Sequence, residues 1–454
     1  MIGGAQHLTR RQWLSAAIGI TAAMTFGAEE AHALGRTPLG GKITMRVPWS
    51  LGSIDPHDLR DPAAALFAHA IFDSLYALDA SSAPYAALAT AMPAREGAGT
   101  VVRLRDGIRT AKGVALDAKD VIFAIERARS RGGSALWTDL PRPAAHPAER
   151  LAIVFGAADP YKLARALASP MYALVPRGFN ASSPDGTGAF KAELKGGKLA
   201  LTRNMSAARG PAFLESIEVE PAADLKASLR QFEAERDDVG WLGTGLFGGR
   251  KNAVRFDCGV LAWIVLVTGS DAGSAGGAGA AQKLVNALPA ERLGHLGLGS
   301  LPAATGTAEW TGPKTDLVVD EGSPHLVEIA RTLAPILSNA GHEVTVSALP
   351  RAEVAKRRGK SALVLDVVRS FGPGNTNAML ALASAEDPAR AADLVRHPPK
   401  SIPTSARAAT ASLSVGVLGE VRSQGGVIPE VTLAKNAAAD GWDLGASYRR
   451  KASK

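Results

Sequence analysis

The segment 316–368 constrains the fold most. It holds a short apolar strand pattern at 316–320, a helical pattern at 325–338 and a second strand pattern at 343–346, with a third apolar run at 363–368. Strands joined through a helix pair in parallel, because antiparallel neighbours need only a tight turn. We therefore predict that this segment forms an α/β domain of its own.

A second ordered unit spans residues 101–130. Val101 and Leu104 stand among charged residues in the alternating pattern of a half-buried strand. Asp117 is the expected N-cap of a following helix, and Asp120 is the acid that a capping box places three positions later. The unit contains no nucleophile, base or ligand cluster, so a structural role is predicted for it.

Four shorter signals complete the framework. Residues 42–49 alternate as a strand, and residues 62–76 have the spacing of a buried helix. The continuous apolar run at 261–267 predicts a fully buried strand or an interdomain crossover. Gly186 and Gly188 bracket a threonine, as expected where the backbone passes close to another element.

Composition narrows the functional classes. The 454 residues are too many for one small core and predict two or three domains. The net charge is +8, but the basic residues are scattered and only 5% of residues are aromatic, which argues against a nucleic-acid groove. Cys258 is the single cysteine, so no internal disulfide is possible, and its apolar neighbours predict an inert buried thiol.

Residues 1–33 are predicted to be an export signal. The paired arginines at 10–11 precede an apolar run at 16–26, which is too short for a stable membrane anchor, and small residues at 31–33 resemble a cleavage site. This pattern is typical of twin-arginine signals. It predicts export of the folded protein and a place outside the inner membrane, in a periplasm. No later run reaches 18 apolar residues.

Several motifs, taken in chain order, resemble the peptide/nickel type (family 5) of extracytoplasmic solute-binding proteins, which serve ABC importers. The resemblance is strong over residues 42–245. The motifs that carry it are Ile54-Asp55-Pro56, Ser74-Leu75-Tyr76-Ala77-Leu78-Asp79, Leu104-Arg105-Asp106-Gly107-Ile108, Ala118-Lys119-Asp120-Val121-Ile122-Phe123-Ala124-Ile125-Glu126-Arg127, Gly186-Thr187-Gly188-Ala189-Phe190 and Thr202-Arg203-Asn204.

The resemblance implies an α/β, two-lobed periplasmic-binding-protein fold with an inserted accessory lobe and mixed sheets. It also implies a monomer without a cofactor, which holds a small-molecule or peptide ligand between its lobes and hands it to an inner-membrane ABC permease. The run near Trp263 would be a hinge strand. From composition we place the first lobe at 34–79, 183–265 and 425–454, the accessory lobe at 80–182 and the second lobe at 266–424.

In such a fold the ligand meets loops at strand ends that face the cleft. Trp49 and Phe371 are equally compatible with ordinary packing, and Arg369 with a surface cation. The residues that we expect to contact the ligand are Trp49, Ser50, Leu51 and Gly52, Gly243, Thr244 and Gly245, and Arg369, Ser370, Phe371 and Asn375.

One departure from the family bears on the ligand. Peptide-binding members often carry an acidic turn after the third strand of the second lobe, whereas residues 368–375 of this chain contain no carboxylate. A buried ammonium without a carboxylate is costly, so a free peptide amine is disfavoured. Arg369 suits a carboxylate or another anion. Bound nickel is disfavoured because the histidines are dispersed.

Three functions stay open at this point. The first is a receptor for an oligopeptide-like solute or an anionic metabolite. The second is a degenerate relative that acts as a sensor, chaperone or docking protein, which a cleft filled by its own side chains would favour. The third is a periplasmic hydrolase with Ser53 or Ser370 as nucleophile, although the sequence contains neither a Gly-x-Ser-x-Gly elbow nor an HExxH helix.

Overall fold

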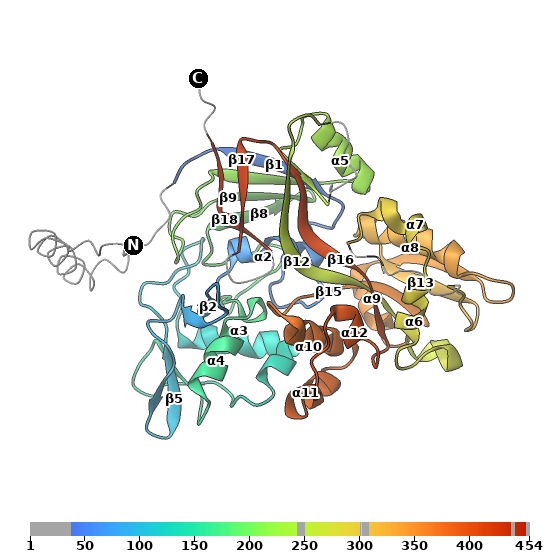
Figure 1. Ribbon diagram of the computed structural model, residues 1–454. Helices are drawn as coiled ribbons and strands as arrows, with labels where there is room; N and C mark the ends of the chain where they lie inside the picture. Colours follow the sequence, from blue (N-terminus) through green and yellow to red (C-terminus); the bar gives the residue numbers. More distant parts are fainter. Residues whose placement is uncertain (1–37, 243–249, 300, 302–307, 437–440, 451–454) are drawn as a thin grey trace, which may run out of the picture.

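A ten-stranded mixed sheet forms the frame of the molecule (Figure 1). The computed structural model describes residues 38–242, 250–299, 301, 308–436 and 441–450. The strands lie in the order β14-β13-β15-β12-β16-β11-β1-β10-β9-β8. Their bounds are β1 Lys42–Val47, β8 Phe190–Lys195, β9 Lys198–Arg203, β10 Ser216–Pro221, β11 Val239–Trp241, β12 Val254–Val267, β13 Thr315–Asp320, β14 Val344–Leu349, β15 Leu363–Arg369 and β16 Val415–Val427.

The strands β12 and β16 connect the two halves of this sheet. They pair antiparallel along their length, with irregular register where Asp257, Val260 and Ala262 pair. One end of the pair contacts β11, and the other end contacts β15. Figure 1 shows the two strands running side by side from the region of β1, β8 and β9 toward β13. The predicted buried strand at 261–267 is confirmed as the second half of β12.

The predicted parallel unit is also confirmed. β13 pairs in parallel with β14 on one side and with β15 on the other, and α8 packs against these strands. The chain returns to the first half at its end, where β17 and β18 form a two-stranded sheet. The elements of these parts are α2 Pro62–Ile71, α5 Leu225–Glu233, α6 Ala280–Asn286, α7 Ala290–Leu293, α8 Pro324–Leu337, α9 Arg351–Arg357, α10 Asn375–Glu386, α11 Pro388–Arg396, α12 Ala406–Ala409, β17 Val431–Lys435 and β18 Trp442–Arg449.

Residues in the range predicted for the accessory lobe build a separate small sheet in the order β4-β5-β7-β6. The predicted capping box is present at the start of α3, where Asp120 N donates to Asp117 (3.3 Å) and Asp117 N donates to Asp120 (3.0 Å). The lobe boundaries themselves stay predictions. The elements in this range are β3 Pro84–Ala86, β4 Ala94–Glu96, β5 Gly99–Arg103, β6 Ala144–Ala145, β7 Ala152–Val154, α3 Ala118–Ala128 and α4 Pro160–Leu167, and β2 Tyr76–Leu78, just before the range, pairs with β3.

The prediction of one helix over 62–76 was wrong at its end. α2 ends at Ile71, and Tyr76 already begins β2. The backbone N–H of Gly188 donates to the Ile71 carbonyl at 2.9 Å, a group that a longer helix would use itself. A Cβ on Gly188 would lie 2.6 Å from that carbonyl carbon, so the predicted close approach of the backbone at 186–188 is confirmed.

The single cysteine, Cys258, is buried, as predicted. Trp442 anchors the returning C-terminal strand, because its Nε1 donates to the Leu66 carbonyl (2.8 Å) and its ring stacks on Phe256. Among the described residues, no helix has the length and apolar character needed to cross a membrane. The predicted export signal at 1–33 lies outside the described residues.

Candidate ligand-binding site

A short loop before α2 contacts both α3 and the α/β unit built on β13, β14 and β15. This central loop, residues 54–61, is folded on itself by Asp61, whose carboxylate accepts from Asp55 N at 2.9 Å and from Ala64 N at 3.1 Å. The second of these bonds caps α2. The loop is therefore fixed to the helix that follows it, and its remaining polar groups face outward to neighbouring elements.

Asp55 joins the central loop to α3. Both its carboxylate oxygens accept from Arg127, each at 2.7 Å, in the fork geometry that is strongest for this pair. The Asp55 side chain is 8% exposed and that of Arg127 is 15% exposed. Burial alone would raise the pKa of Asp55, but the bonds and charge of Arg127 outweigh burial and hold it below its usual value. The pair links two motifs of the family resemblance.

His57 strengthens the same contact. Its Nδ1 lies 3.1 Å from Nη1 of Arg127, and its Nε2 lies 2.8 Å from the carbonyl oxygen of Ala173. A guanidinium can only donate, so Nδ1 accepts and Nε2–H donates to the carbonyl, which is the neutral imidazole. Burial lowers the pKa of His57 to about 4, and the nearby Arg127 charge acts in the same direction.

Other side chains tie the central loop to the α/β unit. Asp58 pairs with Arg351 at 2.8 Å, and Arg60 pairs with Asp366 at 2.5 Å. Arg358 contacts the same Asp366 oxygen at 2.5 Å. Burial alone would raise the pKa of Asp366, but the two guanidinium groups outweigh it and lower the pKa.

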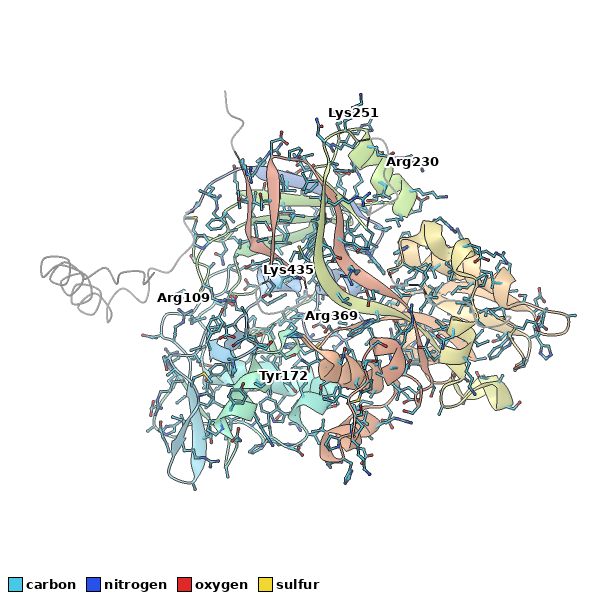
Figure 2. The ribbon with its side chains drawn as sticks, in the orientation of Figure 1. Arg109, Tyr172, Arg230, Lys251, Arg369 and Lys435 are labelled. Atoms are coloured by element: carbon cyan, nitrogen blue, oxygen red, sulfur yellow. The ribbon has the colours of Figure 1, made fainter. Side chains whose placement is uncertain are left out.

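Arg369 completes this set of contacts from the end of β15. Its Nη1 lies 2.9 Å from the Pro56 carbonyl, 3.2 Å from that of Asp58 and 3.3 Å from that of Asp55. The residue is 3% exposed and lies near the middle of the molecule (Figure 2). The central loop is thus bonded to the accessory region through Arg127 and to the α/β unit through Arg351, Asp366 and Arg369.

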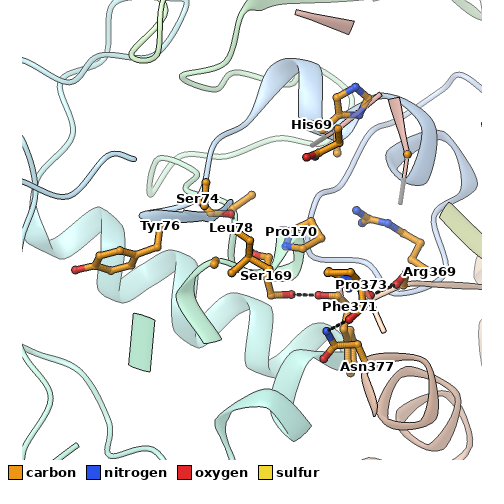
Figure 3. Close-up of a pocket in the computed structure, with 18 of the residues that line it drawn as sticks. His69, Ser74, Tyr76, Leu78, Ser169, Pro170, Arg369, Phe371, Pro373 and Asn377 are labelled. Atoms are coloured by element: carbon orange, nitrogen blue, oxygen red, sulfur yellow. Dashed lines mark hydrogen bonds between the residues drawn. The ribbon is translucent and has the colours of Figure 1, made fainter. Parts of the chain in front are cut away.

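Next to these contacts lies a cavity of about 850 Å³. Ser169 Oγ donates to the Phe371 carbonyl at 2.6 Å and so links two of its walls (Figure 3). Residues from all three predicted lobes line it. The first lobe supplies Ala64, Ala65, Ala68, His69, Phe72, Asp73, Ser74, Tyr76, Ala77, Leu78, Ala189, Arg209, Gly210, Val260, Leu261, Asn436, Gly441, Trp442, Asp443 and Gly445; the accessory lobe supplies Ser82, Tyr85, Ala135, Leu136, Lys162, Arg165, Ala166, Ala168, Ser169, Pro170 and Ala173; and the second lobe supplies Arg369, Ser370, Phe371, Gly372, Pro373, Gly374, Thr376, Asn377, Leu380 and Val395.

Part of the predicted ligand set lies at this cavity. Arg369, Ser370 and Phe371 line it, whereas Asn375 does not, although the next two residues do. Arg369 is predicted to bind an anion, but its Nη1 already donates to the central loop, so an anion would have to share this guanidinium with the loop.

The other predicted residues lie elsewhere. Trp49, Ser50, Leu51 and Gly52 are not among the cavity-lining residues. Trp49 is buried in edge contacts with Trp241 (5.9 Å between ring centres) and His325 (5.4 Å), so packing accounts for its position. Gly243, Thr244 and Gly245 lie outside the described residues. The structure does not bring the first-strand loop together with the Arg369 loop.

One wall of the cavity, formed by α4 and by Arg209, is not predicted from the sequence. Lys162 and Arg165 of α4 line the cavity together with Arg209. Asp159 followed by Pro160 is a readable helix start, but nothing in the spacing shows that this helix faces a cleft. Asp73, another lining residue, accepts from Thr187 at 2.9 Å and lies 3.9 Å from Arg209.

Metal binding has no support in the part of the chain that the structure describes. There, no three His, Cys, Asp or Glu side chains come together closely enough to hold an ion. His57 and His325 are each committed to a backbone carbonyl instead, at 2.8 Å and 2.7 Å.

Comparison with solved structures identifies the architecture. No known protein family profile and no curated protein matches the sequence. The pheromone receptor PrgZ, solved for its mode of peptide binding, matches with a TM-score of 0.66 and 13% identity, over 91% of this chain and 100% of PrgZ. This chain has the fold of the peptide/nickel-type solute-binding proteins. The two-lobed α/β fold that the family resemblance predicted is thereby confirmed.

Two further solute-binding proteins show the breadth of this likeness. The oligopeptide-binding protein AppA from Bacillus subtilis, in complex with a nonapeptide, has a TM-score of 0.64 at 13% identity, over 92% of this chain and 100% of AppA. NikA from Brucella suis, in complex with Fe(III)-EDTA, has a TM-score of 0.59 at 16% identity, over 90% of this chain and 100% of NikA. At these identities the likeness establishes the fold alone.

Proposed function

We propose that this protein is a solute-binding receptor of an ABC importer, which captures a small solute and delivers it to a permease. The solute is oligopeptide-like or an anionic metabolite. The observation that carries the proposal is the cavity of about 850 Å³, whose lining comes from all three parts of the fold. Closing such parts around a solute buries it and removes water, which is how binding proteins of this architecture gain affinity.

The size of the cavity favours this function over the degenerate-relative alternative. A chain that had lost its ligand is expected to fill its cleft with its own side chains, and about 850 Å³ of space argues against that. Of the two serines considered as hydrolase nucleophiles, Ser370 donates to the Gly372 carbonyl at 2.7 Å. Among the described residues neither Ser370 nor Ser53 contacts a base, so we propose a binding protein and not an enzyme.

The location and partners of the protein form the second part of this proposal. We propose that the 1–33 signal directs export by the twin-arginine pathway to the periplasm. We propose further that the receptor is a monomer, partnered by an inner-membrane ABC permease, and that it needs no cofactor. The lobe limits at 79–80, 182–183, 265–266 and 424–425 are part of the same proposal.

A screen of solutes tests this function directly. Di- to pentapeptide pools and a set of organic acids are added to the exported protein, and the melting temperature is followed by differential scanning fluorimetry. A ligand that binds the folded state raises the melting temperature by mass action, and calorimetry should then give one site per chain. A flat response to every pool would overturn the proposal.

A further inference from the structure

The cations on one wall of the cavity indicate the chemical class of the solute. We propose that the bound solute carries an anionic group, such as a carboxylate, that binds Lys162 and Arg165 of α4. This inference rests on the proposed receptor function and deepens it.

The placement of the two side chains is the first observation. Lys162 and Arg165 are three positions apart in α4, so they project from neighbouring points of one helix face. Both line the cavity, along with Ala166 between them and the helix end. Among the described residues neither side chain has an ion-pair partner. The wall therefore offers two positive charges to whatever fills the cavity.

The local energetics give no structural reason for these cations. Lys162 is the third residue of its helix, where the helix dipole favours acids and disfavours a lysine. Two like charges at this spacing also repel each other across the helix surface. Both side chains are exposed, so water screens these penalties while the cavity holds no solute. An anion bound between the two groups would remove both penalties at once.

A third cation lies on the same side of the cavity. Arg209 Nη2 donates to the Tyr85 hydroxyl at 2.9 Å, and Tyr85 belongs to β3, which packs against α4. Both Tyr85 and Arg209 line the cavity. This arrangement places the Arg209 side chain near the α4 face and extends the positive wall.

The carboxylates at the cavity are already engaged. Asp73 accepts from Thr187 and lies beside Arg209, and Asp443 accepts from the backbone N–H of Ala446 at 3.1 Å. Of the four cations that line the cavity, Arg209 lies beside Asp73 and Arg369 binds the central loop, which leaves Lys162 and Arg165 to meet a solute, while both carboxylates are occupied. A free ammonium group would find repulsion here, whereas an anion would find attraction.

Apolar side chains also line the cavity. Leu136, Leu380 and Val395 lie there where the accessory region meets α10 and α11, and Phe371 and Leu261 continue the same surface. A solute that fills the cavity therefore combines an anionic end with an apolar body. Burying apolar area stabilises the complex, and the cations fix its orientation.

Two dyes of nearly equal shape test this inference. 8-Anilinonaphthalene-1-sulfonate (ANS) carries an anionic sulfonate on an apolar body, and N-phenyl-1-naphthylamine is the same ring system without it. Fluorescence titration of the full chain should give at least tenfold tighter binding of the sulfonate dye. The Lys162→Gln/Arg165→Gln variant should weaken the sulfonate dye at least fivefold and change the neutral dye less than twofold.

A matched control distinguishes the effect of the two α4 cations from the effect of the net charge of the protein. The Lys191→Gln/Arg331→Gln variant removes two exposed cations that do not line the cavity, so the net charge changes equally. It should bind both dyes as the parent does. Equal affinity for the two dyes, or a sulfonate preference that survives Lys162→Gln/Arg165→Gln, would refute the anion inference and leave the receptor function standing. Binding of neither dye would overturn both.

Discussion

Replacing Asp55 by asparagine tests the contact that joins the central loop to the accessory region. In the native chain, His57 N donates to Asp55 Oδ1 at 3.0 Å, and the side-chain oxygen of asparagine can still accept this bond. Asparagine removes the negative charge that pairs with Arg127. Breaking a buried pair by removing one partner typically costs about 3–5 kcal/mol, because the other charge stays buried and unpaired. Arg127 keeps its stacking on Phe179 at 4.7 Å, so we expect the lower end, about 3 kcal/mol.

The assay is a double-mutant cycle with Asp55→Asn, Arg127→Gln and both together. The free energy of unfolding is measured by urea titration, with tryptophan fluorescence and circular dichroism as separate probes. Each single variant should lose about 3 kcal/mol, and the double variant should lose about 2 kcal/mol less than their sum. Simple additivity would refute the reasoning, because it would mean that the fork between the two side chains contributes no coupling.

The exposed cluster of Arg103 with Glu96 and Glu149 is the matched control. It also pairs an arginine with carboxylates at similar distances, 2.5 Å and 2.7 Å, but its side chains are 34–43% exposed. Solvent screens such contacts, so Glu96→Gln should leave the unfolding transition unchanged.

Three other perturbations have defined outcomes. Burial lowers the pKa of His57 to about 4, so the unfolded chain takes up the proton first; stability should fall as pH drops from about 6.5 to 4, and His57→Gln should make that fall in melting temperature shallower, while His325, whose pKa burial also lowers to about 4, keeps part of it. Gly188→Ala should lose about 1–3 kcal/mol in urea titration because its Cβ would overlap Ile71, whereas Gly178→Ala, with open space around it, should be neutral. Ser169→Ala removes the bond to the Phe371 carbonyl and should weaken ANS binding about fivefold in fluorescence titration, from the loss of about 1 kcal/mol; unchanged affinity would mean that this bond does not support the closed cavity.

Local patterns were sufficient to predict much of the fold. The helix and strand periods at 316–368 and the capping box at Asp117 depend on residues a few positions apart, and both are present in the structure. The prediction of a helix over 62–76 was wrong at its end because a contact distant in the sequence ends the helix. It ends where Gly188, more than a hundred positions later, binds the Ile71 carbonyl.

The candidate site was less predictable because contacts between distant segments build it. Asp55 and Arg127 were both singled out as family motifs, but nothing in either motif states that the two meet across 72 positions. Likewise, Lys162 and Arg165 look like ordinary cations of a surface helix until α4 is seen against the cavity. Of the predicted ligand residues that the structure describes, Arg369, Ser370 and Phe371 at the end of β15 line the cavity, and their contact with a ligand stays a prediction.

Native mass spectrometry of the exported protein tests the central claim, that the cavity captures a small solute. The protein is isolated gently from cells that export it, incubated with a mixture of peptides and organic acids, and weighed under native and then denaturing conditions. We expect one bound solute per chain in the native spectrum, absent after unfolding, with an anionic group in its fragments. The same bare mass under both conditions would contradict it.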